Sequence, residues 1–115
     1  MDERLKEALE FSQYRTTIKN QLDNLKHKLE AQLIYSDQGG QFKLTQDFLC
    51  FVDLMVRQDK DEVYLLDRNE IPIVIRNPTA FLKKIVHKYH SAVNEYFHLY
   101  KRLIQQRSVQ KVIDE

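Results

Sequence analysis

Glycine is nearly absent from this chain of 115 residues, because its only two copies are adjacent, at positions 39 and 40. A phosphate-binding loop needs several glycines at set spacing, so this kind of nucleotide site is excluded. Two consecutive glycines favour positive φ angles, and the segment 36–41 therefore predicts the end of a helix and a turn. Residues 2–35 contain neither glycine nor proline. This stretch can form one long helix.

Cysteine is equally scarce, with one copy. Cys50 cannot form a disulfide within the chain, and it lies in the apolar run FLCFVDLMV. This position predicts a buried packing role and a reducing compartment. The longest apolar runs fall far short of a membrane span, and the opening MDERLKEALE is too charged for a secretory signal. We therefore expect a soluble cytoplasmic protein that makes no contact with a membrane.

A strong net charge is also missing, since 18 Lys and Arg residues stand against 17 Asp and Glu, for a formal charge of +1. No global attraction to nucleic acid or membrane follows from this balance. Residues 36–77 nevertheless carry five basic and eight acidic side chains, whereas residues 78–115 carry seven and three. This asymmetry marks a solvated face, an attraction between the middle segment and a neighbouring subunit's last helix, or a weak polyanion-binding surface.

A heptad pattern dominates residues 1–35. Hydrophobic residues make up 43% of the chain and charged residues 30%, which is typical of a single globular domain with a modest core. The apolar seam of the first segment consists of Phe11, Ile18, Leu22, Leu25 and Leu29. Its spacing predicts one helix of a coiled coil. Arg15 occupies a seam position, where it either selects a register or extends outward.

The middle segment, residues 41–77, predicts a strand, a helix and a β-hairpin. The helix, over residues 46–58, is apolar on nearly every side and should be buried. The hairpin pairs two β-rich runs, 63–66 and 71–75, around a turn in which Asn69 adopts a positive φ. Because a lone hairpin is marginally stable, we expect residues 42–44 to add a third strand.

The last helix is predicted over residues 78–108, followed by a frayed tail at 109–115. Asn77 and Pro78 supply its N-cap and first helical position. Its seam residues, with spacings of three and four, are Leu82, Ile85, Tyr89, Ala92, Tyr96, Leu99 and Leu103. Further apolar residues flank this seam, which is more than one antiparallel helix would cover. Either the middle segment covers the excess, or another subunit or protein does. The candidate interface residues are Val86, Tyr89, Val93, Tyr96, Phe97, Tyr100 and Ile104.

No constellation of residues predicts catalysis, and none predicts a cofactor. His87 and His90 share a helical face with His98 nearby, but such pairs occur by chance in helices, so we predict no metal site. The acidic segment 59–62 lacks the ligand spacing and the glycine of a calcium loop. No Ser or Cys nucleophile has a recognisable partner. We therefore expect a protein without enzymatic activity.

Basic residues of the last helix provide a second type of candidate site. Those that could contact phosphates or another polyanion are Lys83, Lys84, Lys88, Lys101 and Arg102. Tyr residues could stack on bases, but Tyr89 and Tyr96 fall on the seam, where aromatic side chains usually belong to a core. Nucleic-acid binding is therefore a disfavoured alternative.

Two resemblances add expectations. The order long helix, hairpin, long helix is similar to the β-type subunit of prefoldin, which implies a chaperone that holds clients; the apolar helix within FLCFVDLMV departs from that family. The runs QFKLTQDFLCFVDLMV, EVYLLDRNEIPIVI and AFLKKIV, with VNEY, resemble small uncharacterised proteins of contractile-tailed bacteriophages over residues 41–97. This second resemblance implies an assembly or virion-associated role and transfers no site residues.

The sequence thus predicts an α+β fold with two long antiparallel, coiled-coil-like helices. A short helix and a small antiparallel β-hairpin or three-stranded sheet are inserted between them. The expected function is a non-enzymatic, homo-oligomeric assembly factor that binds a protein partner through the final helix, with the sheet edge as a further candidate. A nucleic-acid-associated accessory protein and a prefoldin-like holdase are the alternatives. The expected location is the cytoplasm, of a host cell if the chain derives from a phage, or the virion.

Overall fold

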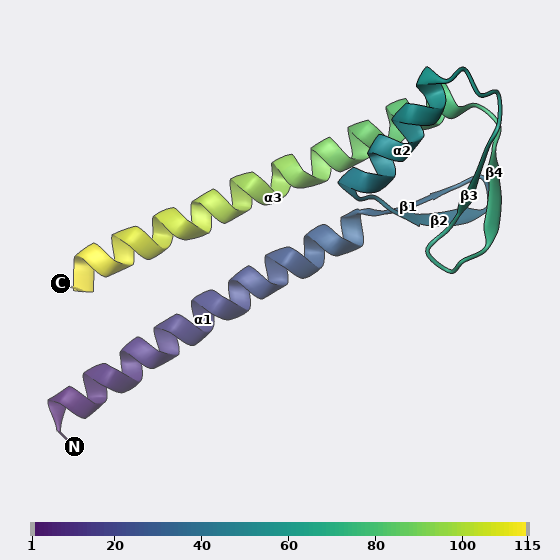
Figure 1. Cartoon of the computed structure of the whole chain (residues 1–115). Coiled ribbons are helices and arrows are strands. Elements are labelled where there is room, and N and C mark those ends of the chain that lie inside the picture. The colour runs from purple at the N-terminus through teal and green to yellow at the C-terminus, as the bar shows by residue number, and fades with distance from the viewer. Residues whose placement is uncertain (1, 115) are drawn as a thin grey trace. The chain divides into compact units, whose positions relative to one another are not determined.

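The computed structural model describes the backbone of residues 2–114 and the side chains of residues 2–106. Its elements (Figure 1) follow in the order α1 (Glu3–Gln32), β1 (Ile34–Asp37), β2 (Gly40–Lys43), α2 (Gln46–Arg57), β3 (Val63–Leu66), β4 (Pro72–Ile75) and α3 (Pro78–Asp114). The predicted α+β class is confirmed. The chain divides into two compact units, a helical unit of residues 1–28 and 95–115 and a core unit of residues 29–94.

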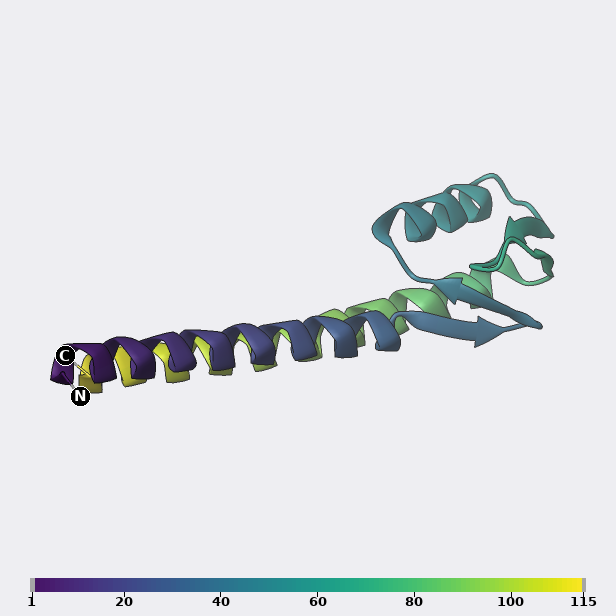
Figure 2. The same ribbon diagram turned by 90° about the horizontal axis from the view of Figure 1, so that it is seen from below.

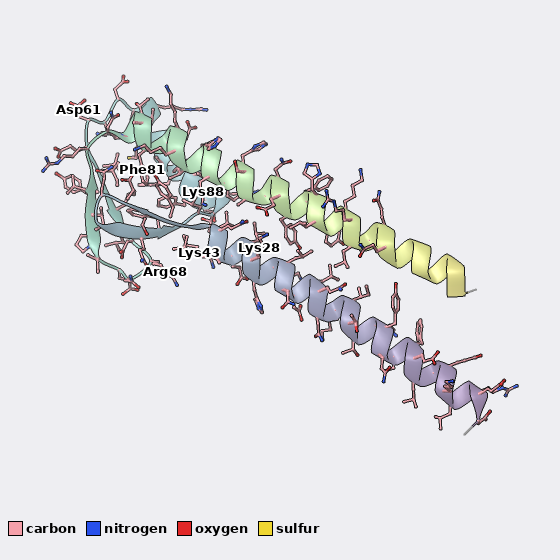
Figure 3. The ribbon with its side chains drawn as sticks, turned by 180° about the vertical axis from the view of Figure 1, so that it is seen from behind. Lys28, Lys43, Asp61, Arg68, Phe81 and Lys88 are labelled. Carbon is pink, nitrogen blue, oxygen red and sulfur yellow. The ribbon has the colours of Figure 1, made fainter. Side chains whose placement is uncertain are left out.

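The core unit gathers α2, both hairpins and the first turns of α3 around one hydrophobic core (Figure 2). The buried members of this core are Phe42, Leu44, Val52, Val63, Leu65, Ile75, Phe81 and Ile85. Phe81, labelled in Figure 3, meets Phe42 edge to face with ring centroids 5.5 Å apart. Phe42 in turn stacks on Phe48 of α2 at 5.6 Å. Aromatic contacts therefore join α2, β2 and α3 in this unit.

The first hairpin begins where the sequence predicts continued helix. The α1 helix ends at Gln32, before the predicted end at residue 35, because the following residues pair with β2 in register Tyr35 to Phe42. Gln38 and Gly39 connect the strands with φ angles of 52° and 86°. Positive φ at both central residues matches the right-handed twist of a two-residue hairpin. The predicted turn is therefore present, with Gly39 in it and Gly40 at the start of β2, but it joins two strands instead of ending the helix.

The predicted third strand is wrong, because residues 40–43 pair with β1 and the two hairpins form separate two-stranded sheets. The β3–β4 turn, rather than a strand, lies beside β2: the Arg68 backbone N–H donates to the Gln41 carbonyl oxygen at 2.8 Å. The predicted turn geometry at Asn69 is also wrong, since Glu70 has the positive φ, at 63°. A bulged turn needs one left-handed residue before the next strand, and that position falls on Glu70.

The α2 helix is buried on one face only. Thr45 is its N-cap as predicted, with its Oγ1 accepting from the Phe48 backbone N–H at 3.1 Å. Val52 is buried, but Phe51 and Leu54 are 44% and 48% exposed. Cys50 is exposed as well, so its predicted burial is wrong. A single helix on a small core can turn only one face inward, whatever the composition of its other face.

The α3 helix starts at a local signal and continues further than predicted. The Asn77 Oδ1 accepts from the Ala80 backbone N–H at 3.2 Å, which confirms the predicted N-cap. The helix continues to Asp114, beyond the predicted end at 108, because no glycine or proline interrupts residues 79–114. Of the predicted tail, Glu115 lies outside the described residues.

The helical unit contains residues 3–28 of α1 and 95–114 of α3 and buries few side chains. Ile18 and Leu103 are its buried hydrophobic residues among the described side chains. The Lys28 Nζ lies 2.9 Å from the Glu95 Oε1, with both side chains about half exposed. The Arg15 guanidinium extends over the Phe11 ring at 5.7 Å, and both residues are exposed. Coiled-coil pairing of the two helices stays a prediction.

Candidate protein-binding surfaces

The predicted interface residues of α3 divide by exposure. Val86, Phe97 and Tyr100 are 46%, 58% and 41% exposed. The half-buried members are Tyr89, Val93, Tyr96 and Ile104. Tyr89 packs against the hydrophobic core of the core unit, so its ring is largely occupied there. The available apolar surface of α3 is thus the row beside the seam rather than the seam itself.

That row is regular along the helix. From Val86 the positions continue in steps of seven, four, three and four through Val93, Phe97, Tyr100 and Ile104. Such steps keep residues on one side of a helix, one position along from the seam. Val86 and Val93 belong to the core unit, and the other three belong to the helical unit. Within the helical unit, Tyr100 is stacked on Tyr96 with ring centroids 6.0 Å apart, which restricts its orientation.

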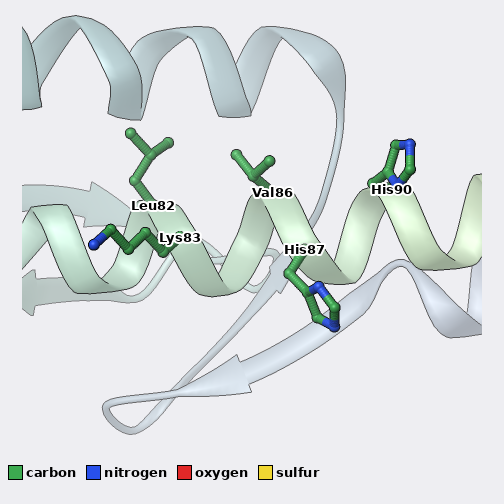
Figure 4. A pocket seen from close by; sticks show the side chains of 5 residues that line it. All are labelled: Leu82, Lys83, Val86, His87 and His90. Atoms are coloured by element: carbon green, nitrogen blue, oxygen red, sulfur yellow. The ribbon is translucent and has the colours of Figure 1, made fainter.

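A shallow open hollow lies on the core-unit part of α3. It has a volume of about 460 Å³ and is lined by Leu82, Lys83, Val86, His87 and His90 (Figure 4). Leu82, Val86 and His90 point to one side of the helix in this view, and His87 points to the other. The lining offers a ligand apolar contact from Leu82 and Val86, with the Lys83 cation at its border.

The predicted polyanion contacts are mostly accessible. Lys83, Lys84, Lys101 and Arg102 are exposed, and Lys88 is half-buried. Across the side chains of residues 2–106, the ion pairs are Lys28 with Glu95 and Arg57 with Asp53, so none of the five is held in one. Three of these cations belong to the core unit and two to the helical unit. No single cluster of all five is therefore established.

A surface that the predicted interface did not include covers the outer side of the β3–β4 hairpin. Tyr64 and Leu66 on β3 are 72% and 65% exposed, and Val74 on β4 is 38% exposed. The two strands read VYLL and PIVI, without the apolar–polar alternation of a half-solvated hairpin. That missing alternation was the available signal, because it makes both faces of the hairpin apolar.

Asp67 is the one buried charged side chain among residues 2–106. Its Oδ1 accepts from the backbone N–H groups of Asn69 and Ile71 at 2.8 and 2.9 Å, and its Oδ2 accepts from Gln41 at 3.2 Å. The hydrogen bond from Ile71 is the main cause that lowers the pKa of this carboxyl group, against the opposing effect of burial. Because both oxygens are engaged by backbone donors, Asp67 organises the turn and is not a catalytic acid.

Two kinds of site are absent from the part of the chain that the structure describes. There, no group of three or more His, Cys, Asp or Glu side chains is arranged to hold a metal ion. Within the same residues, no helix is both long and apolar enough to cross a membrane.

Comparison with known proteins assigns no relative. No protein-family model matches this chain. Searches of curated proteins and of solved structures return no match either. The resemblances to prefoldin subunits and to proteins of contractile-tailed phages therefore stay predictions.

Proposed function

We propose that this chain is a non-enzymatic assembly protein, which associates with copies of itself and binds a protein partner through α3. The observation that carries this proposal is the exposure of two aromatic rings, Phe97 at 58% and Tyr100 at 41%, on one row of that helix. Aromatic side chains dominate the binding energy of many protein interfaces because each buries a large apolar area. Solvent-facing rings in regular helical spacing are what such an interface requires.

The same row is suited to a helical partner. Its three-four spacing is that of a helix that inserts side chains between those of another helix. Exposed cations flank it, including Lys101 and Arg102, so an acidic or mixed-charge helix is favoured over a basic one. An assembly role in a phage particle and a client-holding role of the prefoldin type are two forms of this proposal that differ in the partner.

Binding of a nucleic acid is the second candidate, favoured by the accessible cations outside ion pairs. It requires phosphate contacts from Lys83, Lys84, Lys101 and Arg102, whereas assembly requires the apolar row. The two functions therefore depend on different side chains of one helix. Phosphate contacts also make affinity fall steeply with salt, which apolar association does not.

Light scattering across a concentration series tests the proposal. We expect the native chain to exceed the monomer mass at micromolar concentration, and Phe97→Ser with Tyr100→Ser to lower that mass. The matched control is Lys83→Ala with Lys84→Ala, which removes two exposed side chains of the same helix and should leave the mass unchanged. A monomeric native chain would contradict self-association. If the lysine variant alone loses binding activity and the aromatic variant keeps it, nucleic-acid binding is favoured instead.

A further inference from the structure

The outer face of the β3–β4 hairpin carries an inference that is separate from the α3 row. Strand register pairs Tyr64 with Val74 and Leu66 with Pro72. The alternate residues Val63, Leu65 and Ile75 are buried in the core unit. Side chains of a strand alternate between its faces, so Tyr64, Leu66, Pro72 and Val74 share the outer face. All four are exposed in this structure.

One end of this face carries two opposite charges. The Tyr64 hydroxyl donates to the Glu62 Oε2 at 3.3 Å, which places the Glu62 carboxylate beside the outer face. On the other strand, Arg76 continues the outward positions 72 and 74 and is exposed. The pairing of Val63 with Ile75 sets positions 62 and 76 at the same level. Neither residue is in an ion pair among the side chains of residues 2–106.

We propose that a second copy of this chain docks here, outer face against outer face, to form a symmetric dimer. If the two-fold axis runs parallel to the strands, β3 of one copy lies opposite β4 of the other copy. Paired residues then keep the same height along the strand direction. Tyr64 then faces Val74 of the partner subunit, and Leu66 faces Pro72 of the partner subunit. Glu62 meets Arg76 of the partner subunit, and the pair occurs twice because the interface is isologous. The two hairpins become a four-stranded sandwich with sheets about 10 Å apart.

Charge distinguishes this arrangement from the other two-fold packing of the same faces. An axis perpendicular to the strands would invert the levels, so Glu62 would cover Leu66 of the partner subunit and Arg76 would cover Pro72 of the partner subunit. Both charges would then lose water without gaining an ionic partner, which is costly. With the axis parallel to the strands, both charges have an ionic partner. In this arrangement the hairpin face is self-complementary in charge, and its apolar positions face apolar positions of the partner subunit.

The small area of the outer face limits the stability of the dimer. A few apolar side chains on each hairpin make a smaller contact than the roughly 800 Å² per partner of a standard stable interface. We expect a dimer that dissociates at accessible concentrations, which suits measurement. The inference depends on the self-association that the proposed function includes, and it adds a contact between copies on the hairpin to the one proposed on α3.

Charge reversal tests the dimer without disturbing the core. Glu62→Arg places two cations opposite each other, and Arg76→Glu does the same with two carboxylates. Each should raise the dimer dissociation constant about tenfold or more, because like charges across an interface are strongly unfavourable. Glu62→Arg combined with Arg76→Glu restores opposite charges and should restore association. Asp61→Arg is the matched control, because it makes the same change in net charge one position outside the outer-face row and should leave association at the native level.

Sedimentation equilibrium of the native chain and these variants separates the outcomes. Weakening in both single variants with recovery in the combined variant supports the hairpin dimer. Native-like association in both single variants overturns it, and loss of association in the Phe97→Ser, Tyr100→Ser variant would then leave the proposed function standing. Weakening in the Asp61→Arg control equal to that in Glu62→Arg also overturns it, since net charge alone would explain the effect. A native chain that stays monomeric up to its solubility limit overturns both the dimer and the proposed self-association.

Discussion

The core unit and the helical unit use apolar residues in opposite ways. Among the described side chains, all buried hydrophobic residues except Ile18 and Leu103 lie in the core unit. The helical unit has the more regular pattern, yet it leaves Leu5, Leu9 and Phe11 about half exposed or more. Regular spacing produces a helix with an apolar side, whereas burial needs another surface to cover that side. The core unit buries one side of its hairpins and of α2, whereas the described side chains of the helical unit include two buried hydrophobic residues, Ile18 and Leu103.

The largest expected effect comes from Phe81, which is 1% exposed and contacts three other aromatic rings. Phe81→Ala should lower the free energy of unfolding by about 3–5 kcal/mol, because it removes a buried ring and leaves a cavity. Urea unfolding followed by circular dichroism measures this loss.

Phe97→Ala is the matched control, since it removes the same ring where 58% of the residue is exposed. Its free energy of unfolding should change by about 0.5 kcal/mol or less at a protein concentration low enough to keep the chain monomeric. Equal losses in the two variants would break the comparison between a buried ring of the core unit and an exposed ring of the helical unit.

The next effect concerns Asp67 and extends the comparison of the two units to their polar contacts. Asp67→Asn removes the charge that three backbone N–H groups stabilise, so the urea midpoint at neutral pH should fall. The pKa of Asp67 is lowered from its ordinary value of 3.8, so the unfolded chain takes up this proton first as pH falls. The native stability from this carboxylate is present above pH 3.8 and is lost as pH falls through the depressed pKa. The Asp67→Asn variant should lack this contribution, so its stability should fall less than that of the native chain as the pH is lowered through this range.

Lys28→Ala is the control from the helical unit, where the ion pair with Glu95 is about half exposed. Its cost should be about 1 kcal/mol or less, because exposed ion pairs are screened by water and salt. A larger loss than for Asp67→Asn would mean that the helical unit depends on polar contacts more than the core unit does.

The smallest effect tests the local geometry of the β3–β4 turn. Glu70 has a φ of 63°, which is unfavourable for a residue with a Cβ atom. Glu70→Gly should therefore raise the free energy of unfolding by up to about 1 kcal/mol, the gain being reduced by the greater freedom of glycine in the unfolded chain. Asn69→Gly should give no gain, because Asn69 has no positive φ. Thermal melts of both variants decide which position is left-handed.

Much of the fold follows from local signals. The caps at Thr45 and Asn77, the long helices and the β3–β4 hairpin were predictable because capping, periodicity and β-propensity act over a few residues. The first hairpin was not, since Ile34 and Tyr35 fit a helical pattern and become a strand only by pairing with β2. Among the candidate sites, the apolar row of α3 was visible in the spacing, whereas the only sequence signal for the exposed Tyr64 and Leu66 was the missing apolar–polar alternation of their hairpin.

The sequence by itself determined where α2 and α3 begin and where the chain turns at the glycine pair. It also determined which sides of α1 and α3 are apolar. The reason is that backbone hydrogen bonds and φ preferences are local properties. Tertiary structure decided which apolar sides are covered. Cys50 lies in an apolar run and is exposed, whereas Asp67 is charged and buried. The physical reason is that burial depends on segments far apart in the chain: the backbone N–H of Gln41, in β2, donates to Asp67, which lies 26 positions later in the β3–β4 turn.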